Sequence, residues 1–366
     1  MKNSFGTSVI LTLFGESHGP CVGCVLDGMA PGIPVDEEFI RAQMGLRRSV
    51  ASLSTARREA DEVKILSGVY QGKTTGAPIA LVIENTCQNS GDYAATAGTA
   101  RPGHADLTAY QKYHGYADPR GGGHFSGRLT AALVAAGAIA ISALRAKGIT
   151  VGTHIAACGG VEDSPFSADP CVEIEAINKM PFAVLDERAA AKMQAKIEKA
   201  RLDGDSVGGI LETAVCGLPA GVGEPWFDTL EGVLAHALFS IPAVKGVEFG
   251  DGFGLAALRG SEANDPIRLE NGQIVTAGNR MGGILGGISN GMPLRIRTAI
   301  KPTPSIYKEQ ESVDLDEMRE CPLSIVGRHD PAIVHRARVV VDSAVALVLC
   351  DMLALRFGTD YLAGNK

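Results

Sequence analysis

The hydrophobic pattern of the chain predicts two strands and three long helices. Residues 22–27 and 79–84 are rich in β-branched residues and lie between turn-forming residues, which is typical of strands. Residues 128–147 are alanine-rich, contain no proline and end before a glycine, so we predict a long buried helix there. The amphipathic pattern of residues 186–202 predicts a surface helix, and residues 335–356 predict a C-terminal helix.

Strand-rich sections that flank long helices predict a layered α+β fold. No G-x-G-x-x-G follows a first strand, which argues against a doubly wound dinucleotide-binding fold. Two pairs of segments also echo each other along the chain. GES…GMAPGI at 15–33 is similar to GDS…GLPAGV at 204–222, and GAPIALVI at 76–83 is similar to GMPLRIR at 291–297.

These echoes, in the same order, predict an internal duplication within a single catalytic domain of 366 residues. We expect two pseudo-repeated halves, at about residues 1–150 and 200–356, with an irregular connection at about 155–190. In the second half Val207 stands at the place of His18. The duplication therefore preserves scaffold, while the chemistry is asymmetric.

Composition narrows the class of protein. The chain is 45% hydrophobic and 20% charged, as soluble globular proteins are. The apolar run 131–144 is too short and too interrupted to span a bilayer, and the N-terminus lacks a signal-peptide core, so we expect a cytoplasmic protein with no membrane partner. The net charge of −7 without a basic run argues against a nucleic-acid partner. Local arginine clusters still allow an anionic small-molecule substrate.

The eight cysteines show no disulfide framework. Cys21 and Cys24 form a C-x-x-C pair that would suit a redox pair or half of a zinc site. No second C-x-x-C follows, however, and CVGCVLDG has the pattern of a buried strand, so we favour the strand interpretation. We expect the other six cysteines to be reduced, and we predict no metal site.

Two turn segments place histidine beside other reactive groups. FGESHG, at residues 14–19, sets a carboxylate, a hydroxyl and His18 between glycines, and histidine can exchange a proton near neutral pH. A surface turn would explain this pattern equally well. RPGHAD presents Arg101 and His104 together, and arginine binds phosphate or carboxylate with two hydrogen bonds. Asp106 could instead cap a helix that begins at Leu107.

Three further segments offer sites for anions. The glycines of RGGGHFSGR, at residues 120–128, precede the predicted helix, where backbone N–H groups and the helix dipole attract anions. KPTPS, at 301–305, places a cation and two hydroxyls on a proline-stiffened loop, which suits a phosphoester. Asp330 beside Arg328 could act as a base if it is buried, although Asp-Pro is more often a plain turn.

FGESHG, RPGHAD, RGGG with a following Ser-x-Arg, GGILGGISNG, KPTPS and GRHDP occur in this order over residues 14–331. Together they closely resemble chorismate synthase, and the resemblance covers nearly the whole chain. It implies a sandwich of helices between antiparallel sheets, built from two pseudo-repeated halves and assembled as a homotetramer. It also implies a lyase that eliminates phosphate from 5-enolpyruvylshikimate 3-phosphate to give chorismate, the last step of the shikimate pathway. This 1,4-anti elimination requires reduced FMN without net redox change.

The resemblance also implies roles for individual residues. His18 matches the histidine that protonates the reduced flavin, His104 the one that protonates the departing phosphate, and Asp330 the aspartate that relays the C6 hydrogen. The positions matched to substrate contacts are Ser17, Arg47, Arg48, Arg101, Arg128 and Arg328. The positions matched to the flavin's surroundings are His124, Phe125, Ser126, Ala243, Gly286, Lys301, Pro302, Thr303, Pro304, Ser305 and Arg328.

The sequence departs from the family pattern in two places. LRRSV at 46–50 replaces three arginines followed by Pro-Gly, and it leaves open which of Arg47 and Arg48 meets the substrate. HFSG at 124–127 stands where relatives have Arg-Ser-Ser-Ala, and His124 could partly replace the lost cation. The chain contains no reductase module, so we expect a separate flavin reductase as a partner. A flavin-dependent oxidoreductase and a non-catalytic flavin-binding protein remain as alternatives.

Overall fold

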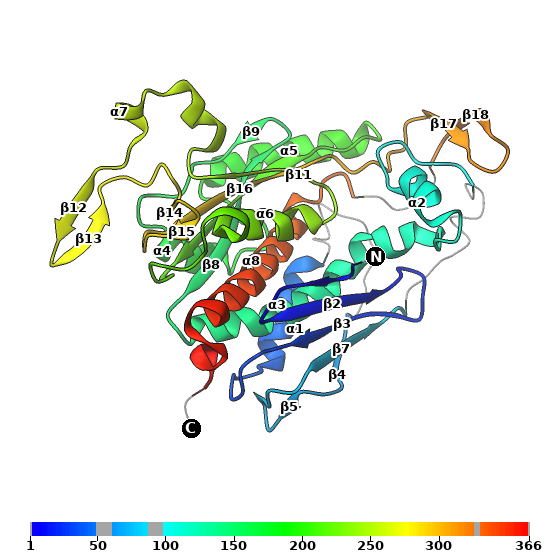
Figure 1. Cartoon of the computed structure of the whole chain (residues 1–366). Coiled ribbons are helices and arrows are strands. Elements are labelled where there is room, and N and C mark those ends of the chain that lie inside the picture. The colour runs from blue at the N-terminus through cyan, green and yellow to red at the C-terminus, as the bar shows by residue number, and fades with distance from the viewer. Residues whose placement is uncertain (1, 49–60, 87–97, 326–329, 365–366) are drawn as a thin grey trace.

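Helices fill the space between two antiparallel sheets, as Figure 1 shows. The computed structural model describes residues 2–48, 61–86, 98–325 and 330–364. The first sheet has the order β1-β2-β3-β7-β4 and the second has the order β11-β16-β10-β8-β9. This arrangement confirms the predicted α+β sandwich.

Each sheet is assembled from short antiparallel strands. The first contains β1 (Ser4–Phe5), β2 (Ile10–Gly15), β3 (Cys21–Asp27), β4 (Val63–Ile65) and β7 (Ile79–Glu84). The second contains β8 (Thr150–Cys158), β9 (Val161–Glu162), β10 (Gly209–Cys216), β11 (Val244–Phe249) and β16 (Leu294–Ile300). Two-stranded ribbons are formed by β5 (Val69–Tyr70) with β6 (Lys73–Thr74), β12 (Ile267–Glu270) with β13 (Gln273–Thr276), β14 (Ile284–Leu285) with β15 (Ile288–Ser289), and β17 (Gln310–Asp314) with β18 (Arg319–Leu323).

Two long helices form the centre of the sandwich. α3 (Thr130–Arg145) packs against the first sheet, α8 (Val334–Phe357) packs against the second, and the two helices pack on each other. A side chain at Gly137 of α3 would begin 2.2 Å from the Cβ of Ser343 on α8, so the glycine permits this close approach. Asp351 of α8 also accepts backbone N–H groups of Thr7, Ser8 and Val9, which holds the chain before β2 against the helix.

The other helices lie around this pair. α1 (Glu37–Arg47) contacts both long helices and begins at Asp36, whose side chain accepts the N–H groups of Glu38 and Phe39. The remaining α-helices are α2 (Asp106–Tyr113), α4 (Cys171–Ile177), α5 (Glu187–Leu202), α6 (Leu230–Ser240) and α7 (Gly260–Ala263). The short 3-10 helices are η2 (Arg120–Phe125), η3 (Gly127–Leu129), η4 (Trp226–Asp228), η5 (Gly252–Ala257) and η6 (Thr359–Leu362).

The five elements predicted from the hydrophobic pattern are all present. The predicted strands correspond to β3 and β7, and the predicted helices correspond to α3, α5 and α8. The helix predicted over 128–147 is shorter, because residues 127–129 form η3 and α3 ends at Arg145. Residues 155–190, expected to be an irregular connection, include the end of β8, the short strand β9 and α4.

The echoing segments lie at matching places in the two sheets. The segment 28–33 follows β3, which pairs with β7, and the segment 217–222 follows β10, which pairs with β16. The second echo leads into β7 in the first sheet and into β16 in the second. This placement supports the predicted duplication, which stays a prediction.

Two cysteine expectations have different outcomes. Cys21 and Cys24 both lie in β3, and Cys24 is fully buried, which confirms the strand interpretation. Burial raises the pKa of the Cys24 thiol to about 12. The expectation that the other six are reduced is wrong for Cys171 and Cys216, which form a disulfide between α4 and β10. Their sequence separation of 45 residues gave no sign of this contact.

One described helical stretch, residues 127–145, is long and apolar enough by length and composition to cross a membrane. However, 78% of its most apolar window is buried inside the protein. This stretch is the core helix α3 with the turn before it, and the core helices of globular proteins meet the same criterion.

Candidate active site

The turn between β2 and β3 carries Ser17 and His18, which are both about 5% exposed. The Ser17 hydroxyl donates to the carbonyl of Arg120 and lies 3.2 Å from His18 Nδ1. The Ser17 N–H donates to the carbonyl of Gly123. These contacts place FGESHG directly against the RGGG segment.

The three glycines of that segment bring two histidines to one place. Gly121, Gly122 and Gly123 all have positive φ, which glycine adopts without strain. A Cβ at Gly121 would lie 2.2 Å from a ring carbon of His18, and a Cβ at Gly122 would lie 3.1 Å from a ring carbon of His104. The imidazole rings of His18 and His104 therefore pack against Gly121 and Gly122. They fill the space that a side chain at either glycine would need.

Asp106 orients the ring of His104. His104 Nδ1 donates to Asp106 Oδ1 over 2.6 Å, and Arg101 donates to both oxygens of the same carboxylate over 2.7 and 2.8 Å. Burial by itself would raise the pKa of Asp106, but the hydrogen bonds from Arg101 and His104 lower it well below its usual range. Helix α2 does begin here, but Asp106 binds Arg101 and His104 instead of capping the helix. This carboxylate leaves His104 Nε2 as the nitrogen that can act on a substrate.

The KPTPS loop lies beside RPGHAD. Lys301 donates from Nζ to the carbonyl of Gly103, and its own N–H donates to the carbonyl of Ala243. Ala243 has φ +76, a strained conformation for a residue with a side chain. Partial burial, with Lys245 nearby, lowers the pKa of Lys301.

Two residues of the second half of the chain form hydrogen bonds with the KPTPS loop and with Pro331. The Ser206 hydroxyl donates to the carbonyl of Thr303 over 2.7 Å, and the Val207 N–H donates to the carbonyl of Pro331 over 2.8 Å. The turn that echoes FGESHG thus supports KPTPS and the residue after Asp330. The absence of histidine at Val207 is consistent with a supporting role.

The end of the glycine segment contacts the last residue of β2, Gly15. His124 Nδ1 donates to the carbonyl of Gly15 over 2.9 Å, because a carbonyl oxygen can only accept. The Ser126 hydroxyl accepts the N–H of Arg128 and caps η3. Phe125 is 37% exposed beside Tyr113.

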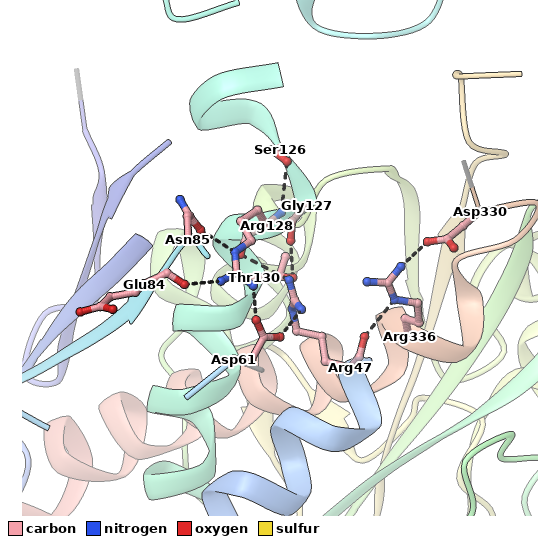
Figure 2. Close-up of polar contacts among 10 residues, drawn as sticks. All are labelled: Arg47, Asp61, Glu84, Asn85, Ser126, Gly127, Arg128, Thr130, Asp330 and Arg336. Carbon is pink, nitrogen blue, oxygen red and sulfur yellow. Dashed lines mark hydrogen bonds and ion pairs between the residues drawn. The ribbon is translucent and has the colours of Figure 1, made fainter. Parts of the chain in front are cut away.

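Two of the arginines expected to bind substrate, Arg47 and Arg128, share a buried carboxylate, as Figure 2 shows. Arg47 Nη1 lies 3.1 Å from Asp61 Oδ2, and Arg128 Nη1 binds Asp61 Oδ1. Arg47 is 4% exposed and Arg128 is 7% exposed. Burial by itself would raise the pKa of Asp61, but Arg47 and Arg128 lower it below its usual value.

Asp330 is joined to the same group of residues through Arg336. Arg336 binds Asp330 with Nη1, and it donates from Nε to the carbonyl of Arg47 over 2.9 Å. The Asp330 side chain is 10% exposed. Among the described residues, Arg336 of helix α8 is thus a cation paired with this aspartate.

One expected site residue, Gly286, is not brought to this group. Gly286 lies in the turn of the β14–β15 ribbon, and Figure 1 shows that ribbon far from α2 and from β17–β18. Arg328 lies outside the described residues. Arg48 follows α1, is half-buried and lies near enough to Asp61 to help lower its pKa, whereas Arg47 binds Asp61 directly.

Comparisons with known proteins agree with the motifs. Residues 9–354 match the family profile described as chorismate synthase. The chain is 48% identical over 351 residues to a chorismate synthase of Thermococcus kodakarensis, covering 96% of this chain and 97% of that protein. It is 49% identical over 360 residues to a chorismate synthase of Dehalococcoides mccartyi, covering 98% of each. A crystal structure of chorismate synthase superimposes with a TM-score of 0.76 and 30% identity over 96% of this chain and 94% of that one.

The chain belongs to the chorismate synthase family. It is accordingly an enzyme, a lyase of the class that forms chorismate. The resemblance stated from six motifs is confirmed over nearly the whole length.

Sequence reasoning missed three residues that hold the site of this enzyme together. Asp61 binds both arginines, Asn85 binds Arg128, and Arg336 binds Asp330. Asp61 follows a run of mixed charges, and Asn85 follows a strand, where polar residues are common. Only the arginine-rich composition of the motifs indicated that a buried carboxylate would be needed to balance them.

Proposed function

We propose that this enzyme eliminates phosphate from 5-enolpyruvylshikimate 3-phosphate to give chorismate, with reduced FMN bound and without net redox change. One observation carries the proposal. His18 and His104 lie against consecutive glycines, and the neighbouring Gly103 is bound by Lys301. Two proton-carrying rings and a cation thus meet where three separate motifs converge, as an elimination that releases phosphate requires.

The residues around KPTPS suit FMN. Thr303 Oγ1 is buried and has no hydrogen-bond partner among the described residues. This hydroxyl could therefore donate a hydrogen bond to a ligand or accept one from it. Lys301 supplies a cation for a phosphate group, and the strained Ala243 lies beside it. The residues we propose to hold FMN are His124, Phe125, Ser126, Ala243, Gly286, Lys301, Pro302, Thr303, Pro304, Ser305 and Arg328. When bound, reduced FMN supplies the transient electron donation that lets an unactivated system lose phosphate.

His104 is proposed to protonate the phosphate as its C3–O bond breaks. Its Nδ1 is held by Asp106, so the ring has a fixed orientation and Nε2 faces away from the carboxylate. Arg101, fixed on the same carboxylate, lies beside the ring as a second positive group.

His18 and Asp330 are proposed to handle the other protons. The Ser17 hydroxyl lies against His18 Nδ1 and fixes the ring, and His18 is proposed to direct a proton at the flavin. Asp330 would accept the hydrogen lost from C6, and Arg336 holds its carboxylate in place. The proposed substrate-binding positions are Ser17, Arg48, Arg101 and Arg328, whereas Arg47 and Arg128 are proposed to hold the site in shape through Asp61.

We also propose a cellular location, an oligomeric state and a partner from the resemblance to the family. The enzyme would act as a cytoplasmic homotetramer and receive reduced FMN from a separate flavin reductase. Neither nucleic acid nor membrane is proposed as a partner. The negative net charge of −7 supports the absence of a nucleic-acid partner.

An anaerobic assay with 5-enolpyruvylshikimate 3-phosphate and photoreduced FMN tests the function. We expect chorismate and inorganic phosphate to appear in equal amounts while the flavin stays reduced. Oxidation of flavin or nicotinamide in proportion to product would instead indicate an oxidoreductase. A folded, flavin-loaded protein that yields no product would indicate a binding protein and would overturn the proposal.

A further inference from the structure

We propose that Asp61 is a positioning residue of this enzyme, the centre of a buried brace that fixes the His18 turn relative to Asp330. The brace consists of Asp61, Arg47 and Arg128, with Asn85 and Arg336 at its two ends (Figure 2). The inference rests on the proposed roles of His18 and Asp330.

One arm of the brace runs from Asp61 to the His18 turn. Arg128 binds Asp61 with Nη1 and donates from Nε to Asn85 Oδ1 over 2.9 Å. Asn85 Nδ2 in turn donates to the carbonyls of Glu16 and Gly19, over 3.0 and 2.9 Å. The two backbone groups that flank Ser17 and His18 are therefore tied to Arg128 through a single amide.

The other arm runs from Asp61 to Asp330. Arg47 binds Asp61 from the last turn of α1, and its carbonyl accepts the Nε donor of Arg336 over 2.9 Å. Arg336 binds Asp330 with Nη1. The arm thus connects the end of one helix to the start of another, and it ends on the proposed proton acceptor.

The contacts of the two arginines favour bracing over direct contact with substrate. Arg47 donates from Nε to Thr130 Oγ1 and from Nη2 to the carbonyl of Arg128, in addition to its bond to Asp61. Arg128 donates from Nη2 to the carbonyl of Glu84, in addition to its bonds to Asp61 and Asn85. Each guanidinium nitrogen of both residues therefore already has a protein acceptor.

The charge arrangement explains why an aspartate is required at this place. Two guanidinium groups buried side by side would repel each other, and each loses hydration on burial. Asp61 gives one oxygen to each arginine, and its side chain is only 1% exposed. Since a buried pair of this kind adds little net stability over apolar packing, its main contribution here is geometry. Protons move efficiently only when the reacting groups are held within a fraction of an ångström of their required positions.

Asp61→Asn removes the charge and little else. Asp61 has φ +47, and asparagine tolerates that conformation as aspartate does. We expect kcat to fall by at least about tenfold, because two charge-assisted hydrogen bonds are weakened. We expect KM for the substrate and the Kd of oxidised FMN to change by less than about threefold, because the binding groups remain.

Asp163→Asn is the matched control, since Asp163 is also a buried, ion-paired carboxylate but lies at His154, outside the brace. We expect it to lower the melting temperature and leave kcat unchanged. If Asp61→Asn does not fold, Thr130→Val removes one acceptor of Arg47 at nearly constant shape, and a smaller fall in kcat is expected. An unchanged kcat in the folded variant would overturn the positioning role. A rise in KM with unchanged kcat would show that the arginines bind substrate directly, and it would overturn the proposal as well.

A second readout is independent of turnover. If the brace is continuous, Asp61→Asn and Asn85→Ala affect the free energy of unfolding non-additively, whereas Asp61→Asn and Asp163→Asn add. Additivity of the first pair would overturn the brace, whatever reaction the enzyme catalyses. Absence of product from the wild-type enzyme would overturn the proposed function instead, and the double-mutant cycle would still decide whether the brace exists.

Discussion

At the scale of single residues, the glycines at 121 and 122 determine how closely the two histidines approach the same loop. Their missing side chains leave the places where His18 and His104 pack. The sequence predicted an anion site from these glycines, because they precede a helix. The packing of Gly121 against His18 joins segments about one hundred residues apart, and local sequence holds no information on such a contact.

Gly121→Ala tests this packing. Its Cβ would lie 2.2 Å from a ring carbon of His18, and φ at this position is +61, so His18 must move. A displacement of about 1 Å in a catalytic group can reduce the rate by about a hundredfold, and we expect kcat to fall by about that factor. The measurement is steady-state turnover under anaerobic conditions, with the melting temperature followed in parallel.

Gly127→Ala is the control for that variant. Its Cβ would have no atom within 4 Å, and its φ is not positive, so kcat should stay within about twofold of wild type. An active Gly121→Ala enzyme would mean that His18 has room to shift without consequence, and the proposed role of His18 would then be wrong.

At the scale of elements, a buried histidine links the strands of the second sheet. His154 of β8 binds Asp163 with Nδ1 and Glu212 of β10 with Nε2, both over 2.9 Å. Burial by itself would lower the pKa of His154, but the hydrogen bonds to these two carboxylates raise it above its usual value. The ring therefore holds its proton more tightly in the folded protein than in the unfolded chain.

The stability of the enzyme should depend on pH through this contact. Because the folded pKa of His154 is raised, its stabilisation is complete below the unfolded pKa of about 6.5 and is lost as the pH rises through the folded value. We expect His154→Gln to lower the unfolding free energy by about 3 kcal/mol at pH 6, since two buried carboxylates lose their cation.

Melting temperatures of wild type and His154→Gln between pH 6 and 9 check this expectation. The difference between the two proteins should shrink toward the alkaline end of the range. A difference that stays constant with pH would mean that His154 is neutral in the folded protein.

Most long elements could be predicted from the sequence, whereas the links between them could not. α3, α5 and α8 carry strong apolar periodicity or composition, and β3 and β7 are β-branched and bounded by turns. Asp61, by contrast, binds partners from α1 and from η3, so its role depends on tertiary structure alone. Of the candidate site, the histidine turns and KPTPS could be predicted. The carboxylates that orient them could not, since Asp106 was expected to cap a helix and instead binds His104, two residues away in its own motif.

At the scale of the whole molecule, the two halves of the chain contribute different groups to the candidate site. The turn that contains Ser17 and His18 contributes reactive groups, and the echoing turn that contains Ser206 and Val207 supports KPTPS and Pro331 by hydrogen bonds. The predicted duplication would account for this division, because the second copy would provide the same turn without the histidine.

The exposed apolar residues of the β12–β13 ribbon support the predicted homotetramer. Leu269 lies opposite Ile274 in the register and Ile267 lies two residues before Leu269, so all three share one face of the ribbon. They are 66–76% exposed, and Figure 1 shows the ribbon extending away from the two sheets. A lone two-stranded ribbon is marginally stable in water, and an exposed apolar face of this kind indicates a protein contact. We therefore expect a second copy of the chain to cover it.

Leu269→Asp places a charge at the centre of this face and should disrupt the assembly, because a buried unpaired carboxylate is costly. Light scattering after size exclusion should give four times the mass of the 38.1-kDa chain for wild type and a smaller mass for the variant. Leu202→Asp is the control, since Leu202 is 70% exposed at the end of α5 and should leave the mass unchanged. A monomeric wild type would contradict the tetramer itself. A tetrameric Leu269→Asp variant would exclude only the ribbon as its interface, and the tetramer would then have to form through another surface.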